Sequence, residues 1–125
     1  GKIVLDSCNP IPARDGEMAV PARAKGTGVA SAEFLPGVRL VRAFNSVGFS
    51  ALRSEAHRAG EKIAIPLAGD DAGALAVASR LVEDAGFEPL VVGPLADAKK
   101  FDAGTPVFGK AFAARELRRM LGLGS

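Results

Sequence analysis

Polar side chains follow two apolar runs of the chain, and their types suit ligand binding. The segment 6–10 (DSCNP) follows an apolar run at residues 3–5, and Asn45 and Ser46 follow the run at residues 38–44. In open α/β sheets, ligands bind beyond the carboxyl ends of the strands. An asparagine offers both a donor and an acceptor, which suits a carboxamide or the edge of a flavin-like ring. Asn45 and Ser46 could equally be a turn residue and a helix cap, so residue types alone leave both interpretations open.

Cys8 and His57 are the single cysteine and the single histidine of the chain. A cysteine nucleophile needs a base beside it. His57 falls in a predicted helix rich in charge, which favours a surface histidine, so an independent cysteine enzyme is the weakest hypothesis. One cysteine excludes an intramolecular disulfide and a cysteine-built metal site. It also favours a reducing compartment, the cytoplasm.

The remaining charged candidates favour structural roles. Asp70 and Asp71 precede an apolar helical pattern, where capping explains them better than acid/base or metal chemistry. Arg39 and Arg42 flank a strand and could meet a phosphate, but solvated strand-end charges are the default expectation. Three phenylalanines near the end are predicted to be core or interface residues before they are pocket residues: Phe101, Phe108 and Phe112.

The totals indicate one domain spanning residues 1–125. Hydrophobic residues make up 48% and charged residues 24%, as in an ordinary globular protein. No apolar run approaches the roughly 18 residues of a membrane span, so we expect no membrane partner. The net charge of +2 is scattered along the chain and the seven aromatic residues are all phenylalanine. We therefore expect no nucleic-acid partner.

Apolar runs alternate with amphipathic stretches, which predicts an α/β fold. Strands are expected at residues 2–6, 38–44, 62–67 and 88–92, with Pro66 at an edge or a strand end. Helices are expected at 46–59, after Asp70 and Asp71 until Gly86, at 95–101 and at 110–121, with one or two helical turns at 31–35. Residues 11–28 hold several prolines and glycines and are predicted to form a long loop. The pattern indicates a mostly parallel sheet with flanking helices, its first two strands covered on both faces.

A dinucleotide site needs a glycine-rich turn between a strand and a helix. The closest segment is 26–31 (GTGVAS), which lacks the third glycine and has no predicted strand immediately before it. It is therefore rejected as a dinucleotide fingerprint.

Four short motifs occur in an order that resembles a known family: GKIVLDSCNP at 1–10, VRAFN at 41–45, PLAGDD at 66–71 and VGPL at 92–95. They are similar to segments of bacterial NADPH-dependent oxidoreductases related to coenzyme F420-dependent NADP reductase. The resemblance covers essentially the whole chain, matched to the carboxy-terminal portion of that family. It implies the second half of a Rossmann-type NAD(P)-binding domain, without the amino-terminal Gly-rich strand-turn-helix.

The resemblance also implies a function and a site. Members of that family pass a hydride between NADP(H) and a deazaflavin such as F420, or a flavin, lying across the strand ends. Asn9 and Asn45 are the expected ring-edge contacts, with Pro10 and Phe44 as packing surfaces. No side chain looks like a catalytic acid or base, which suits direct hydride transfer, where positioning matters most.

The same resemblance predicts an open sheet edge. The strand from Lys2 to Asp6 would lack the neighbour that it has in the family, so self-association or a missing companion segment is expected there. The chain would then be a portion of an NADP(H)-dependent oxidoreductase, expected to be inactive by itself and without a bound cofactor. The alternative is a non-catalytic ligand-binding or dimerisation module derived from that family.

Overall fold

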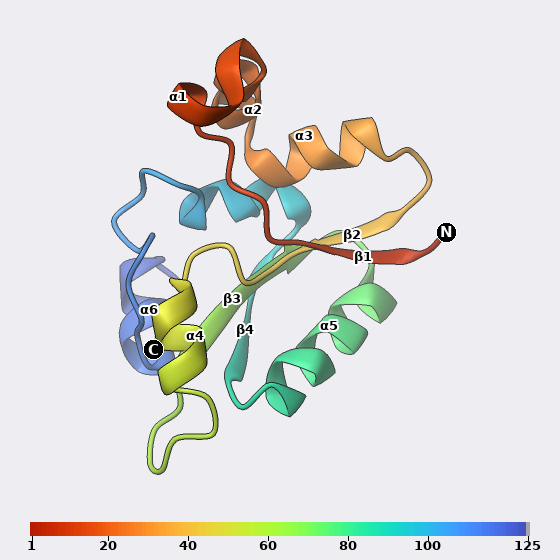
Figure 1. Ribbon diagram of the computed structural model, residues 1–125. Coiled ribbons are helices and arrows are strands. Elements are labelled where there is room, and N and C mark those ends of the chain that lie inside the picture. Colours follow the sequence, from red (N-terminus) through yellow and green to blue (C-terminus); the bar gives the residue numbers. More distant parts are fainter. Residues whose placement is uncertain (125) are drawn as a thin grey trace.

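Four strands form one sheet in the computed structural model, which describes residues 1–124 (Figure 1). The strands lie in the order β1 (Ile3–Asp6), β2 (Arg39–Arg42), β3 (Ala64–Gly69) and β4 (Glu88–Gly93). β1 and β2 are parallel, β3 and β4 are parallel, and β2 runs antiparallel to β3. The predicted α/β fold with a mostly parallel sheet and flanking helices is confirmed. Because of the antiparallel junction, the carboxyl ends of β1 and β2 lie at one end of the sheet and those of β3 and β4 at the other.

Helices cover both faces of the sheet, and alternate residues of β3 divide the core between them. Ile65 and Leu67 pack in a first core cluster with α5 (Ala72–Asp84). Ala64 and Ala68 pack in a second cluster with the 3₁₀ helix η2 (Leu95–Phe101) and α6 (Ala114–Met120). All six residues of β3 are buried, so this strand is the centre of the molecule.

The capping predicted for the helix after the two aspartates is confirmed for Asp71, whereas Asp70 binds the start of a different helix. Asp71 Oδ2 accepts a hydrogen bond of 2.8 Å from the Ala74 amide and caps α5. Asp70 Oδ1 accepts a bond of 2.9 Å from the Leu95 amide at the start of η2. Gly86 follows α5 with a φ of 96°, as its predicted role as a helix stop requires.

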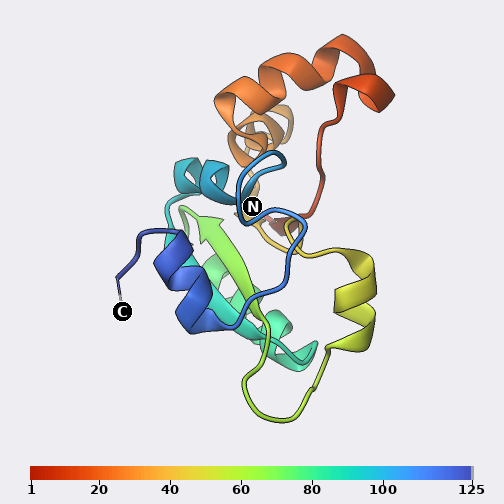
Figure 2. The same cartoon turned by 90° about the vertical axis from the view of Figure 1, so that its left-hand side faces the viewer.

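The loop predicted over residues 11–28 is wrong. Four helical segments occupy it: α1 (Pro12–Asp15), η1 (Gly16–Met18), α2 (Ala19–Lys25) and the start of α3 (Thr27–Phe34). Gly16 and Gly26 take positive φ values of 79° and 102° between helices. The glycines separate short helices here, and Pro12 opens one. In Figure 2, α1 and α2 project away from the sheet.

Two other predicted helices are shorter than expected. α4 covers only Phe49–Ser54, because Ser46 is buried and its carbonyl accepts a bond of 2.7 Å from the Gly109 amide. α6 begins at Ala114 because the preceding segment pairs with the start of β3, where the Phe112 carbonyl accepts from the Ala64 amide at 2.8 Å. Pro66 lies in an inner strand, but β2 pairs with β3 only at Ala68 and Gly69, so no β2 residue opposes the proline.

β1 and β4 are the two edge strands of the sheet in the described part of the chain. Ile3, Val4 and Leu5 are half-buried, so the expectation that β1 is covered on both faces is wrong. The main contacts of α5 are with β2, β3 and β4, and those of α3 on the sheet are with β2, which leaves β1 thinly covered. Among residues 1–124, no helix has the length and apolar character needed to cross a membrane.

Candidate functional site

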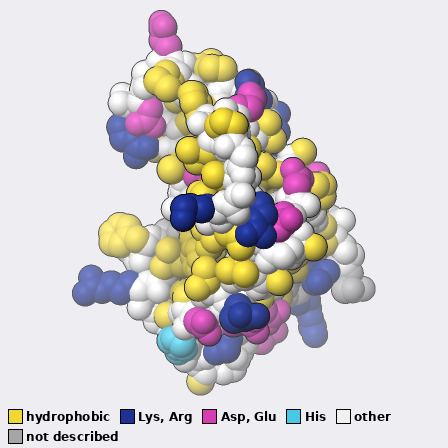
Figure 3. All heavy atoms as spheres, turned by 90° about the vertical axis from the view of Figure 1, so that its right-hand side faces the viewer, with side chains coloured by type: hydrophobic (Ala, Val, Ile, Leu, Met, Phe, Trp, Pro, Cys, Tyr) yellow, Lys and Arg dark blue, Asp and Glu magenta, His cyan; other side chains and the backbone are white. Residues whose placement is uncertain are grey.

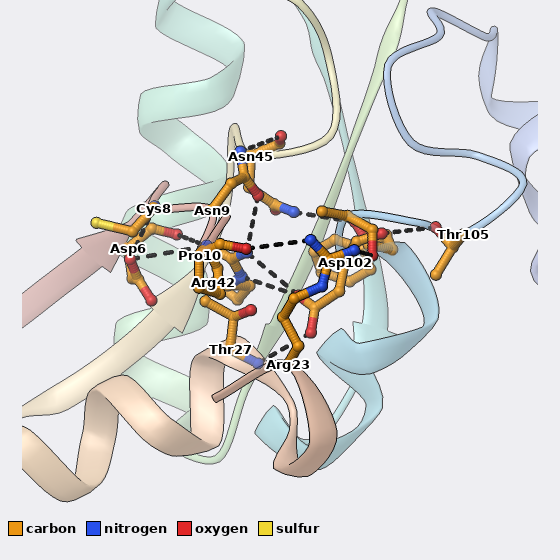
Figure 4. Close-up of polar contacts among 12 residues, drawn as sticks. Asp6, Cys8, Asn9, Pro10, Arg23, Thr27, Arg42, Asn45, Asp102 and Thr105 are labelled. Carbon is orange, nitrogen blue, oxygen red and sulfur yellow. Dashed lines mark hydrogen bonds and ion pairs between the residues drawn. The ribbon is translucent and has the colours of Figure 1, made fainter. Parts of the chain in front are cut away.

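A fully buried arginine lies at the carboxyl end of β2. None of the Arg42 side chain is exposed. Its Nη2 donates to Asp102 Oδ1 and to Asn9 Oδ1, both at 3.2 Å, and its Nη1 donates to the Asp6 carbonyl at 3.2 Å. The Asp6 carboxylate lies 3.7 Å from Nη1, so two buried carboxylates flank one guanidinium (Figure 4).

The predicted solvated strand-end arginine is therefore wrong for Arg42. β2 pairs with β3 at this position, opposite the small Ala68, and the segment after η2 brings Asp102 onto the guanidinium. Arg39, at the other end of β2, is exposed and forms an ion pair of 3.5 Å with Asp71. The two arginines therefore differ in burial, although the sequence around them is similar.

Asp102 connects this arginine to the helical layer. Its Oδ2 accepts a bond of 2.9 Å from the Thr27 amide, the first residue of α3, while its Oδ1 binds Arg42. A protein carboxylate therefore occupies the N-terminus of α3. Gly26 lies at the junction between α2 and α3, Gly28 lies inside α3, and a helix rather than a strand comes immediately before them. This agrees with the rejection of residues 26–31 as a dinucleotide fingerprint.

The two candidate asparagines lie together. Asn9 Nδ2 donates to the Asn45 carbonyl at 3.1 Å, and Asn45 Nδ2 donates to the Phe101 carbonyl at 2.9 Å. Asn45 is buried, and its Oδ1 has no hydrogen-bond partner among the described residues. The Asn9 amide bonds both Arg42 and Asn45, yet keeps one N–H free of the bonds found in residues 1–124.

A pocket of about 600 Å³ opens beyond the carboxyl end of β1. The segment after β1 forms one wall, and helices α1 to α3 form the others. Apolar side chains predominate, with polar groups from Asn9, Thr27 and Ser31. Such a mixture is typical of small-molecule sites. The apolar lining comes from these residues: Pro10, Ile11, Met18, Ala19, Ala22, Ala30, Phe34 and Phe108.

The structure brings two of the four predicted site residues to this pocket. Asn9 and Pro10 line it. Asn45 lies behind Asn9, and Phe44, with a φ of 64°, packs against the first core cluster. Of the three phenylalanines near the end, Phe101 and Phe112 belong to the second core cluster and Phe108 lines the pocket.

Sequence reasoning missed the polar network beneath the pocket: Asp6, Thr27, Arg42 and Asp102. Asp102 carries no local signal that it binds residues 60 and 75 positions away. Arg42 does carry one, because it interrupts the apolar run of residues 40–44 just before Asn45. A charge inside such a run is expected to find a buried partner.

The rim of the pocket carries one ion pair, between Arg14 and Asp15 at 2.8 Å. The hydrogen bond from the Arg14 side chain is the largest cause that lowers the pKa of Asp15 to about 2, and a hydrogen bond from the Ile11 amide is the next. This carboxylate is therefore ionised at neutral pH and is a poor general base. Within residues 1–124, no three His, Cys, Asp or Glu side chains gather as a metal site.

Cys8 presents an exposed thiol at the pocket wall. A side-chain hydrogen bond to Asp6, then partial burial and the Asp6 charge, raise the pKa of this thiol. His57 follows α4, where its amide donates to the Gly86 carbonyl at 3.0 Å, and it does not line the pocket. A cysteine nucleophile needs its thiolate, so this environment works against one.

We expect alkylation of Cys8 by iodoacetamide to be slow at pH 8. Only the thiolate reacts, and Asp6 disfavours the thiolate. The rate should therefore rise with pH, and the pH at half of the maximal rate (the midpoint) should lie above the ordinary cysteine pKa of about 8.5. Asp6→Asn should move the midpoint to lower pH. The measurement is the rate against pH, with the urea-unfolded chain as reference. Equal midpoints for the folded and unfolded chains would contradict this account.

Two solved structures are similar in fold to this chain. No protein-family model matches the chain, and no curated protein matches it. A solved structure of hypothetical protein SMa0349 from Sinorhizobium meliloti superposes with a TM-score of 0.75 and 24% identity, over 88% of this chain and 54% of that one.

A second solved structure comes from Arthrobacter sp. FB24, a protein described as a candidate F420-dependent NADP reductase. It superposes with a TM-score of 0.66 and 24% identity, over 79% of this chain and 46% of that one. The chain therefore spans about half the length of both proteins. What these comparisons establish is that it shares their fold over that half.

Proposed function

We propose that the chain is the ring-binding portion of an NADP(H)-dependent oxidoreductase of the cytoplasm. The proposed reaction moves a hydride between nicotinamide and a deazaflavin such as F420, or a flavin. One observation carries the proposal: a pocket of about 600 Å³ lies beyond the carboxyl end of β1. Support comes from the fold shared with the Arthrobacter protein and from the rule that ligands bind at such strand ends.

The residues around this pocket fit a flat, partly polar ring. Pro10, Ala19 and Ala30 offer apolar walls, and Asn9 has an N–H to spare for a ring-edge acceptor. Asn45 contributes through its carbonyl, which holds the Asn9 amide in place. The contact of Phe44 with the ring stays a prediction from the resemblance. A bound flavin or deazaflavin would supply the hydride-accepting ring, and the chain supplies position and exclusion of water.

The described residues do not fit the pyrophosphate of NADP(H). The Asp102 carboxylate occupies the N-terminus of α3, the helix start beside the pocket, and would repel a phosphate there. We therefore propose that the chain alone transfers no hydride, and that the nucleotide would be held by another part of a longer protein.

A non-catalytic module is the second candidate, and two observations favour it. The described residues lack a phosphate cradle, and β1 lies at the edge of the sheet. An open edge recruits another strand, so we propose that it is an interface for a second copy or for a companion segment.

Titration of FMN, and separately of F420, into the 125-residue chain tests the pocket. Ala22 lines it, so Ala22→Phe should weaken ring binding by at least about tenfold, because the added ring takes the ligand's space. Ala24→Phe is the matched control, since Ala24 lies exposed on the same helix and should bind as the wild type does. The measurement is ring fluorescence or absorbance against concentration.

Two outcomes of this titration would contradict the proposal. If neither FMN nor F420 binds, the pocket is no ring site and the non-catalytic module is favoured. If NADPH added to the same samples gives a saturable response, a nucleotide site exists without the glycine-rich turn, and our account of Asp102 is wrong.

A further inference from the structure

Residues 11–25 (the α1–α2 segment) form α1, η1 and α2 and have few ties to the rest of the molecule. Their main contacts with other elements are with α3, and Ala19 is the one buried residue among them. Their main-chain hydrogen bonds reach no further along the chain than Gly26, among the bonds found in residues 1–124. Met18 and Val20 are 71% and 57% exposed, and Figure 3 shows hydrophobic side chains on the outside of this layer of helices. The position of the segment therefore depends on a few side-chain contacts.

Both ends of the α1–α2 segment are fixed to the buried network around Arg42. On the amino-terminal side, Asn9 Oδ1 accepts a bond of 3.2 Å from Arg42 Nη2. On the carboxy-terminal side, the Thr27 amide donates to Asp102 Oδ2 at 2.9 Å, and Asp102 Oδ1 binds Arg42. The segment is thus suspended between two anchored residues that share one arginine. Any motion of the segment must occur between these anchors.

Gly26 is suited to be a hinge between the segment and the body of the molecule. It joins α2 to α3 with a φ of 102° and a ψ of 130°. A Cβ atom on Gly26 would meet nothing closer than the Lys99 side chain at 3.7 Å, so this joint is loosely packed. At Gly28 a Cβ atom would lie 2.9 Å from Leu95 Cδ1, so α3 packs closely on η2 and belongs to the body. Hinges are a few residues at element ends that absorb changes in φ and ψ.

The half-buried Arg23 side chain ties α2 to both anchored ends (Figure 4). Its Nη1 donates to the Pro10 carbonyl at 3.2 Å and its Nη2 to the Ala103 carbonyl at 3.3 Å. Pro10 follows the anchored Asn9, and Ala103 follows the anchoring Asp102. These two bonds hold α2 against the body, and their loss should let the segment move about its ends.

The candidate pocket lies between the α1–α2 segment and the body. The segment contributes Met18, Ala19 and Ala22 to the lining, and α3 contributes Ala30 and Phe34. A rotation of the segment about its two ends would separate these walls and widen the entrance. A ligand that contacts both walls would hold the segment in place, because it binds the closed arrangement better than the open one.

We propose that the α1–α2 segment is a lid, which opens about Pro10 and Gly26 to admit the ring ligand and is held closed by Arg23. The gating of a ligand rests on the proposed function, whereas the opening itself does not depend on any ligand. The closed lid excludes water from the ring, which suits a site that works by positioning.

Hydrogen–deuterium exchange of the 125-residue chain tests the hinge. Amides of residues 12–25 should exchange together, and at least about tenfold faster than those of α3. Arg23→Gln should raise the exchange rate of residues 12–25 by about a further tenfold and leave α3 and β3 unchanged, because it removes two charged donors. Arg53→Gln, at an exposed arginine of α4, is the matched control and should change none of these rates.

Two results of the exchange experiment would overturn the lid. Exchange of residues 12–25 as slow as that of α3 would show that the segment and the body are one rigid unit. An Arg23→Gln variant with exchange raised equally in residues 12–25, α3 and β3 would show a general loss of stability instead of a local opening.

Thiol labelling separates the lid from the ring site. In a Cys8→Ser background, Ala30→Cys places a thiol on the α3 wall of the pocket, where the alanine is 7% exposed. A bulky maleimide should label this thiol about tenfold faster when Arg23→Gln is added. Ala78→Cys, at a fully buried position of α5, reports global unfolding and should keep its rate. Equal labelling at position 30 with and without Arg23→Gln would contradict the proposal. If Arg23→Gln accelerates labelling but saturating FMN does not slow it, the lid stands and the ring site fails.

Discussion

Arg42→Met is expected to lower the free energy of unfolding by about 3–5 kcal/mol. The substitution keeps most of the side-chain volume but removes the cation that pairs with two buried carboxylates, those of Asp6 and Asp102. It also removes the donor to Asn9 Oδ1 and one of two donors to the Asp6 carbonyl, which keeps its bond from the Ala43 amide. Urea denaturation followed by circular dichroism measures the change.

The matched control for this substitution is Arg39→Met at the other end of the same strand. Arg39 is exposed, and its ion pair with Asp71 is long, so its loss should cost no more than about 1 kcal/mol. A second variant isolates the network: Arg42→Met combined with Asp102→Leu should be less destabilised than the two single changes added together. Equal effects for Arg42→Met and Arg39→Met would mean that the buried pairs contribute no more than a surface pair.

Phe101→Ala is expected to cost a similar amount, about 3–5 kcal/mol. The Phe101 side chain is fully buried at the end of η2, in the core cluster that also contains Val107 and Leu117. Its removal leaves a cavity beneath β3 and loosens the segment whose carbonyl holds Asn45. Thermal or urea unfolding measures the loss.

Phe34→Ala is the control for this change, because Phe34 is 72% exposed and should stay within about 0.5 kcal/mol of the wild type. Since Phe34 lines the pocket, it should alter ring binding more than stability. A Phe101→Ala chain as stable as Phe34→Ala would show that η2 contributes little to the core.

The sequence predicted the elements that carry their own local signals. α5 has an aspartate cap, apolar residues at helical spacing and a glycine after its end, and it forms as expected. Residues 11–28 were mispredicted because prolines and glycines that separate short helices look like those of a loop. The antiparallel direction of β3 relative to β2 had no local signal either. The direction of a strand depends on the path that the chain takes between the two strands.

The candidate site was predictable only at its surface. Asn9 and Pro10 follow a strand and line the pocket, as the strand-end rule suggests. Asn45 and Phe44 follow the neighbouring strand, yet Asn45 is buried beneath the pocket and Phe44 is half-buried against the first core cluster. The difference depends on Asp102 and Phe101, which bind this end of β2 from almost sixty residues later in the chain.

The long-range hydrogen bonds of Asp102 also affect the order in which the chain folds during synthesis. A chain grows from its amino terminus, and native contacts form only after both partners have emerged from the ribosome. Asp102 binds Thr27 and Arg42 across 75 and 60 residues, so the pocket wall stays incomplete until residue 102 has been made. Long-range closures of this kind form slowly. Until Asp102 has been made, the nascent chain holds Arg42 without one of its carboxylates and α3 without the carboxylate at its N-terminus, so the buried polar network at this end of β2 is incomplete during this interval.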